Sequence, residues 1–200
     1  MPFEVRNGAD VLLRQAFLFF GSYGRIGLLI SLILLSVYFF LKGKSIIKTD
    51  EINPLILFGM IIEGFVYGFI LFIVFNNIPN LLILGKEGLN TIEKLYLAIG
   101  AGIFEEFIFR FIFIGLLLTL FFKIFKITKG SIFIPLLLLS SLVFSGFHYV
   151  GVFGDSFQWK SFFLRFTAGG YLGLIFYFRG FAICAIAHIF YDFIIIQGIQ

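Results

Sequence analysis

Three charged side chains stand in the middle of a long apolar stretch, residues 95–122. They are Glu105, Glu106 and Arg110. A charge at bilayer depth costs about 2.5–3.5 kcal/mol even on insertion scales, so three together indicate a function that offsets the cost. On a helix, Glu106 and Arg110 lie one turn apart on one face, whereas Glu105 points about 100° away from Glu106. We therefore predict a structural ion pair between Glu106 and Arg110, and we assign the chemistry to Glu105.

The chain contains only two histidines, His148 and His188. Asp192 follows His188 at the i+4 position, so on a helix its carboxylate can orient the imidazole or share a metal ion with it. Phe144 and His148 have the same spacing, which places an aromatic ring beside the second imidazole. With Glu105, these residues supply a general base, two imidazoles and a further carboxylate. Such a set suits activation of one water molecule, either directly or through a divalent metal, zinc being the most fitting.

The composition says where these side chains must lie. The chain of 200 residues is 60% hydrophobic and only 13% charged, and it contains 32 phenylalanines. A water-soluble domain of this size could not bury so much apolar surface, so we predict an integral membrane protein. The net charge of +4 comes from lysines in short connections, which indicates membrane topology rather than nucleic-acid binding. A single cysteine, Cys184, excludes an internal disulfide and a cysteine-rich metal site.

The fold expected from this pattern is all-α, a polytopic bundle of about six transmembrane helices. The expected spans are residues 16–41, 52–75, 95–122, 131–153, 161–178 and 181–199. We divide this single integral-membrane domain into N-terminal helices at 1–94, with two spans and a loop, and a core of four spans at 95–199. Antiparallel neighbours bring the start of the third span and the ends of the fourth and sixth to one membrane face. Glu105, both histidines and Asp192 then reach the same half of the bilayer.

Other polar groups in the apolar segments have simpler interpretations. Glu63 is expected to pack between helices or to line a substrate path. Arg165 is expected to extend its guanidinium toward the lipid headgroups. Cys184 precedes His188 by four residues, so a Cys–His dyad is geometrically open, but no second sequence feature supports it.

Three short motifs occur in order on successive apolar segments: EExxxR at 105–110, FxxxH at 144–148 and HxxxD at 188–192. Together they resemble the signature of the CPBP family of intramembrane proteases, which includes the CAAX prenyl endopeptidases and bacterial proteins once grouped as Abi or bacteriocin-immunity proteins. The resemblance covers residues 95–199. It implies that Glu105, His148 and His188 are catalytic and that position 192 completes the site. The family often has Asn at that position, and Asp192 adds a negative charge.

The function that these observations favour is an intramembrane endopeptidase. It would hydrolyse a peptide bond near the membrane anchor of a peptide or protein substrate, within the lipid bilayer of a bacterial cell membrane. Water would be activated by Glu105 with His148 or His188, with or without a metal. Two alternatives stay open: a non-catalytic immunity or scaffold protein, and a small proton-coupled transporter that uses Glu63, Glu105 and Asp192 as a relay.

Other classes of intramembrane protease do not fit the sequence. It has no HExxH zinc motif. Tyr191-Asp192 matches the YD of presenilin-like aspartyl proteases, but no GxGD follows it, and Ser145-Gly146 lacks a rhomboid-type GxSx context.

Positive charge gathers in the connections at 42–51, 123–130 and 179–180. This distribution predicts that these connections face the cytoplasm and that the site opens toward the outer face of the membrane.

Overall fold

The computed structural model describes residues 53–76, 90–126, 129–150 and 155–197, and every regular element in these ranges is helical. The predicted all-helical class is therefore confirmed. Four helices, 54–75, 91–125, 130–147 and 159–179, are long and apolar enough to cross a membrane, and 181–197 forms a shorter apolar helix. The first expected span, 16–41, lies outside the described residues.

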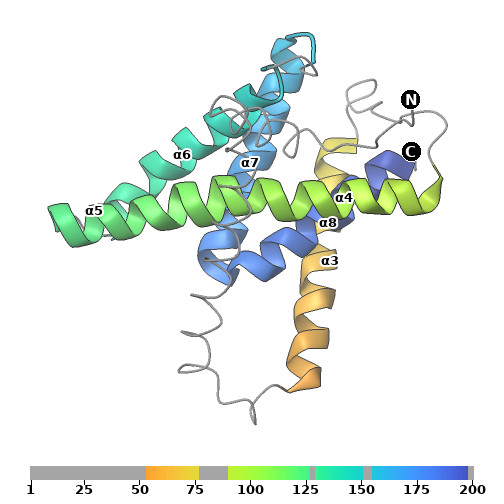
Figure 1. Ribbon diagram of the computed structural model, residues 1–200, viewed down its shortest axis with the longest axis horizontal. Coiled ribbons are helices and arrows are strands. Elements are labelled where there is room, and N and C mark those ends of the chain that lie inside the picture. The colour runs from red at the N-terminus through yellow and green to blue at the C-terminus, as the bar shows by residue number, and fades with distance from the viewer. Residues whose placement is uncertain (1–52, 77–89, 127–128, 151–154, 198–200) are drawn as a thin grey trace, which may run out of the picture.

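One continuous rod runs along the length of the molecule in Figure 1 and carries the EExxxR motif. It consists of α4 (Thr91–Glu106), a π-helix, η2 (Phe107–Leu116), and α5 (Leu117–Phe125). The rod begins four residues earlier than expected because Asn90 and Glu93 form a capping box. The Glu93 backbone N–H donates to Asn90 Oδ1 at 2.9 Å, and the Asn90 N–H donates to Glu93 Oε2 at 2.8 Å.

The π-helix begins directly after the two glutamates. Its wider turns are uncommon in proteins and occur frequently at functional sites. Beyond Glu106 the side chains therefore no longer advance by the 100° steps assumed from the sequence. Within it, the carbonyl of Phe109 accepts a hydrogen bond from Ser140 Oγ at 2.8 Å, which ties the rod to α6 (Lys129–Phe147).

The last helix packs against several others. Helix α8 (Phe181–Gln197) packs against α3 (Pro54–Asn76), α4 and α7 (Trp159–Arg179). Glycines allow the close contacts: a Cβ at Gly68 of α3 would lie 2.5 Å from the Ala187 carbonyl oxygen, and one at Gly102 of α4 would lie 2.8 Å from the Ile189 backbone nitrogen. The backbone that carries His188 is thus held between α3 and α4.

Helices α6 and α7 pack side by side and close the other flank of the site (Figure 1). Helix α6 ends at Phe147, six residues before the expected end of this span, so His148 lies in the turn just beyond it. Between α7 and α8 the chain reverses at Gly180, whose φ of 87° is a conformation that favours glycine.

The outer surfaces of the helices are apolar. Large hydrophobic side chains on α3 and α7 are exposed, Leu55 at 79% and Phe178 at 70% among them. In water such surfaces would drive aggregation, whereas in a bilayer they face acyl chains. Together with the apolar helices, this makes the chain an integral membrane protein.

Candidate active site

Glu106 is the most connected side chain of the site, and it is fully buried. Its Oε1 accepts from Arg110 Nη1 at 2.9 Å and lies 2.7 Å from His188 Nδ1. Its Oε2 accepts from the Cys184 thiol at 2.9 Å. The expected ion pair with Arg110 is therefore present, and the carboxylate also holds the imidazole, which the sequence did not predict.

Arg110 is enclosed on every side, with no measurable exposure. Its Nη2 donates to the Gly169 carbonyl oxygen at 3.0 Å, and its guanidinium carbon lies 4.5 Å from the centre of the Phe144 ring. A buried guanidinium is costly unless its charge is paired. The contacts with Glu106, Gly169 and Phe144 pair the charge and bind η2, α7 and α6 together, whereas Nε has no hydrogen-bond partner among the described residues.

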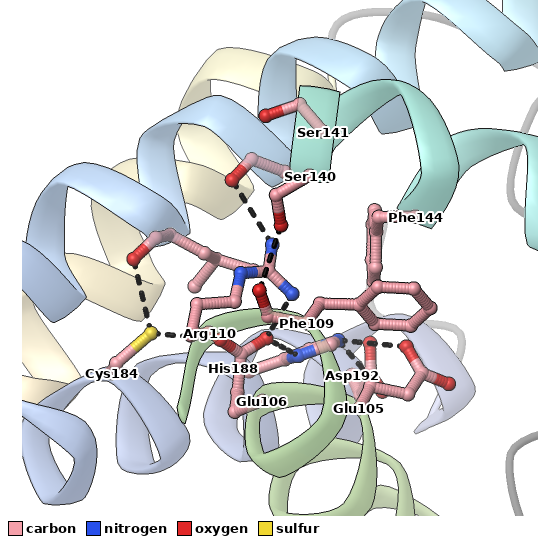
Figure 2. Close-up of polar contacts among 12 residues, drawn as sticks. Glu105, Glu106, Phe109, Arg110, Ser140, Ser141, Phe144, Cys184, His188 and Asp192 are labelled. Atoms are coloured by element: carbon pink, nitrogen blue, oxygen red, sulfur yellow. Dashed lines mark hydrogen bonds and ion pairs between the residues drawn. The ribbon is translucent and has the colours of Figure 1, made fainter. Parts of the chain in front are cut away.

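His188 presents its two ring nitrogens to different carboxylates, as Figure 2 shows. Glu106 lies at Nδ1, while Glu105 Oε2 lies 3.9 Å and Asp192 Oδ2 lies 3.5 Å from Nε2. Because an ionised carboxylate only accepts, the contact with Glu106 places a proton on Nδ1. The imidazole is thereby fixed in orientation, with Nε2 turned toward Glu105 and Asp192.

The sequence left two roles open for Asp192, orienting the imidazole of His188 or sharing a metal ion with it, and in the structure Glu106 makes the orienting contact. Asp192 lies against Nε2 at 3.5 Å, which is beyond a good hydrogen bond, whereas Glu106 lies within hydrogen-bond distance of Nδ1. Glu105 is 7% exposed and, among the described residues, its nearest charged partner is His188. It is thus the least committed carboxylate, as its position on the helix predicted.

His148 lies at the edge of this cluster. Its Nδ1 is 2.9 Å from the Phe144 carbonyl oxygen, which only accepts, so Nδ1 carries the proton and Nε2 is left as a base. Burial, reinforced by the positive charge of Arg165, lowers the pKa of His148 to about 4. The imidazole is therefore neutral near pH 7.

Phe144 connects the two imidazoles. Its ring centre lies 5.1 Å from that of His148 and 6.1 Å from that of His188, both edge-on. The aromatic ring expected beside His148 thus also borders the second histidine. Among the described residues, no direct hydrogen bond joins His148 to His188 or to Asp192.

Cys184 does not form the Cys–His dyad that its spacing from His188 had left possible. Its thiol is fully buried and donates to Glu106 Oε2 at 2.9 Å and to the Leu172 carbonyl oxygen at 3.1 Å. The contact with Glu106 makes it a supporting donor for the carboxylate that orients His188. The i,i+4 spacing from His188 was the sequence signal that placed this thiol near the site.

Two further charged residues pair in ways that the sequence did not predict. Arg165 is buried rather than extended outward: it is 8% exposed, and its Nη2 donates to Asp155 Oδ2 at 2.6 Å. Glu63 of α3 pairs with Arg179 at the end of α7, with Arg179 Nη2 2.6 Å from Glu63 Oε2. This second pair joins two helices and lies apart from the three motifs, in line with the packing role expected for Glu63.

The donor set was also expected to suit a divalent metal. Among the residues that the structure describes, no three His, Cys, Asp or Glu side chains are grouped so as to hold a metal ion. His148 stands apart with its Nδ1 at a backbone carbonyl, and His188 has Nδ1 committed to Glu106.

The geometry can be compared with known proteins at this point. The family model described as "Type II CAAX prenyl endopeptidase Rce1-like" matches residues 88–194, more than half of the chain. The chain belongs to the Rce1-like family. No curated protein and no solved structure matches it.

The matched range of the Rce1-like family contains all three motifs and the helices that carry them, α4 through most of α8. This agrees with the resemblance to CPBP intramembrane proteases. Membership supports intramembrane protease activity in general and an action on membrane-anchored substrates. The roles of individual residues rest on the geometry above.

Proposed function

We propose that this Rce1-like chain is an intramembrane endopeptidase that hydrolyses a peptide bond beside a lipid-anchored residue, such as a prenylated cysteine. One observation carries the proposal. Glu105 and Asp192 both face Nε2 of His188, at 3.9 and 3.5 Å, while Glu106 fixes the other ring nitrogen. Apolar helices surround the cluster, so the substrate would enter from the bilayer.

The two distances at Nε2 suit a bridging water molecule. Direct hydrogen bonds are shorter, and polar groups held 3.5 to 3.9 Å apart can be linked by a water. A water held between Glu105 and His188 has a base on one side and an imidazole on the other. This is the position that we assign to the nucleophile.

The reaction then divides among three side chains. Glu105 accepts a proton from the water as its oxygen attacks the scissile carbonyl carbon, and it returns that proton to the leaving amine when the C–N bond breaks. His188, as an imidazolium that donates from Nδ1 to Glu106, donates from Nε2 to the developing oxyanion. The neutral His148 accepts a hydrogen bond at Nε2, from the water or from the substrate amide, and helps to align it.

The test uses purified protein in proteoliposomes and a farnesylated cysteine peptide that extends three apolar residues beyond the cysteine. Mass spectrometry reports the bond that is cut. We expect cleavage next to the modified cysteine, and none with Glu105→Gln or His148→Gln. Glu63→Gln is the matched control, because it removes a carboxylate from the apolar region outside the three motifs, and it should keep the rate within a few-fold. A folded wild type that leaves the peptide intact would favour the immunity or scaffold alternative.

A metal-assisted form of the same hydrolysis is tested separately. It would need Glu105, His148, His188 and Asp192 to gather around one ion. Metal content of the purified protein, with and without chelation, and the cleavage rate after chelation are the measurements. If the protein holds one zinc per chain and its removal abolishes cleavage, the metal-assisted mechanism is correct and direct water activation is wrong.

We propose the bacterial cell membrane as the location of the protein under either mechanism.

A further inference from the structure

Unlike His188, which lies within α8, His148 lies beyond the end of a helix. Helix α6 ends at Phe147, and residues 148–150 form the turn that follows it. The backbone nitrogen of His148 is 3.4 Å from the Ser145 carbonyl oxygen. That is longer than the roughly 2.7–3.2 Å of a normal N–H···O hydrogen bond. The turn therefore holds its own first residue weakly, and contacts from outside the turn must fix the imidazole.

Helix α7 contacts this turn through two hydrogen bonds in series. Arg165 Nη2 donates to Asp155 Oδ2 at 2.6 Å, and the Asp155 backbone N–H donates to the His148 carbonyl oxygen at 2.9 Å. The second bond is shorter than the backbone bonds at 3.1 to 3.4 Å that the residues of the turn donate. Because Arg165 holds the carboxylate of Asp155, the backbone of Asp155 is kept in place. Its N–H in turn keeps the His148 carbonyl in place.

The guanidinium of Arg165 contacts the turn at a second point. Its central carbon lies 5.4 Å from the centre of the Tyr149 ring, within the range of a cation–π contact, and Tyr149 is the second residue of the turn. Ser145 Oγ donates to the Phe162 carbonyl oxygen at 2.6 Å, which joins the last turn of α6 to α7 one helical turn before Arg165. The position of Arg165 relative to the turn is therefore fixed by contacts on both helices.

The contacts at the backbone also determine where the imidazole lies. His148 Nδ1 is 2.9 Å from the Phe144 carbonyl oxygen near the end of α6, and this contact orients the ring only while the His148 backbone stays in place. A shift of the turn would move Nε2, the atom that we assign to aligning the water or the substrate amide. Misplacement of a group in an active site by about 1 Å can slow a reaction about 10²-fold. Whatever holds the turn therefore affects the rate.

We propose that Arg165 and Asp155 are positioning residues that hold His148 in the active site. The proposal rests on the proposed function, because it gives the pair a role in the same hydrolysis. Neither side chain has to touch the substrate, since both act through the backbone of His148. A pair that only stabilised the fold would lower the melting temperature when broken, whereas a positioning pair also lowers kcat in the folded protein.

The test compares Asp155→Ala with Asp155→Asn, using the farnesylated peptide in proteoliposomes. Both substitutions remove the charge opposite Arg165, so both should lower the melting temperature. Asparagine keeps an oxygen that can accept from Arg165 Nη2, and alanine does not. We expect Asp155→Ala to lower kcat about 10- to 100-fold with KM within a few-fold of the wild type, and Asp155→Asn to keep kcat within about five-fold.

Two further variants complete the series. If Asp155→Ala fails to fold because the charge of Arg165 is left unpaired, Asp155→Ala with Arg165→Met removes that charge as well and should show the same loss of kcat. Glu63→Ala is the matched control. It makes the same kind of deletion in a second ion pair of α7, the one between Glu63 and Arg179 outside the three motifs. It should keep kcat within a few-fold of the wild type.

A spectroscopic measurement reports the position of the imidazole without any cleavage. The chain contains only two histidines, so nitrogen NMR of isotope-labelled histidine can follow His148, whose signals are those missing from the His148→Gln protein. With the proton held on Nδ1, the two ring nitrogens of His148 should give well-separated signals. In Asp155→Ala these signals should move toward each other as the proton exchanges between the nitrogens. They should stay unchanged in Asp155→Asn and Glu63→Ala.

The outcomes separate this inference from the proposed function. Loss of kcat together with the change in the His148 signals, in Asp155→Ala but not in Asp155→Asn, upholds the inference. A folded Asp155→Ala protein with wild-type kcat overturns it and leaves the peptidase intact, and so does a loss of kcat with unchanged His148 signals. If alanine and asparagine lower kcat equally, the pair acts through its charge and the inference is overturned as well. If the wild type does not cleave but the His148 signals change as expected, Asp155 holds His148 and the peptidase is overturned.

Discussion

Removing the charge of Glu106 is the sharpest structural test of the site. Glu106 accepts hydrogen bonds from Arg110, His188 and Cys184 and is fully buried, as is Arg110. In Glu106→Gln the amide oxygen can occupy the Oε1 position and still accept from Arg110 and His188. The substitution therefore removes the charge while it keeps most of the geometry. It leaves the Arg110 guanidinium buried without a counter-charge in contact with it.

The size of the effect follows from that burial. Removing one partner of a buried ion pair costs about 3–5 kcal/mol, because the remaining charge is neither solvated nor paired. For a chain of 200 residues this corresponds to a fall in melting temperature on the order of 10 °C. Glu105→Gln is the matched control, since Glu105 makes only the 3.9 Å contact with His188 among the described residues. It should change the melting temperature by no more than about 2 °C.

Thermal unfolding in detergent micelles, followed by tryptophan fluorescence or by circular dichroism, measures both variants. A second arm adds Arg110→Met to Glu106→Gln. The double variant should be less destabilised than the sum of the two single changes, because the stranded charge is removed. If Glu106→Gln melts with the wild type while Glu105→Gln unfolds it, the roles of the two carboxylates are reversed.

Three further predictions follow from the same contacts. Cys184→Ser keeps a donor to Glu106 and should be nearly neutral, whereas Cys184→Val removes it and should lower the melting temperature; loss of cleavage in the serine variant, with thiol reagents blocking the wild type, would point to a cysteine nucleophile. The pKa of His148 is lowered to about 4 in the folded chain, so unfolding takes up a proton between pH 6.5 and 4 and stability falls as the pH drops through that window. His148→Gln should reduce this loss, and an identical pH dependence of its melting temperature would contradict the burial of the imidazole. A cysteine at Lys126, where α5 ends, should resist an impermeant maleimide on intact cells if the basic connections face the cytoplasm, and labelling from outside would reverse the orientation.

The pair of Glu106 with Arg110 could be predicted because it depends on one helix alone. Four residues bring two side chains onto one face, and that relation holds although the π-helix begins just after Glu106. The separate direction of Glu105 follows from the same geometry. The edge-on contact of Phe144 with His148 is a third local relation, and it persists although His148 lies beyond the helix end.

Contacts between helices could not be predicted with the same detail. The predicted topology brings the site residues of α4 and α8 to the same half of the membrane. It does not give the rotation of each helix about its own axis. That rotation decides that Glu106, rather than Asp192, lies at Nδ1 of His188. It depends on close packing at glycines such as Gly102, whose effect requires the positions of Ala185 and Ile189 on the partner helix.

The pairing of a helix residue with a residue in a connection was the hardest feature to predict from the sequence. Arg165 appeared in the sequence as a lone cation near the end of a span, for which reaching the headgroups is the usual solution. Its partner Asp155 lies ten residues away, in the connection before α7, and no helical period relates the two. The Asp155 N–H donates to the carbonyl oxygen of His148, in the turn after α6. Apolar runs predict spans well, but they do not predict how short connections fold back over them.

The central claim is that Glu105 activates the water that hydrolyses the peptide bond. It is tested most directly by the single-turnover cleavage rate of the farnesylated peptide in proteoliposomes, for the wild type and for Glu105→Gln proteins with matching melting temperatures. Loss of a general base should slow the reaction by about 10²–10⁴-fold while peptide binding stays within a few-fold. A folded Glu105→Gln protein that cleaves within ten-fold of the wild-type rate would contradict the claim.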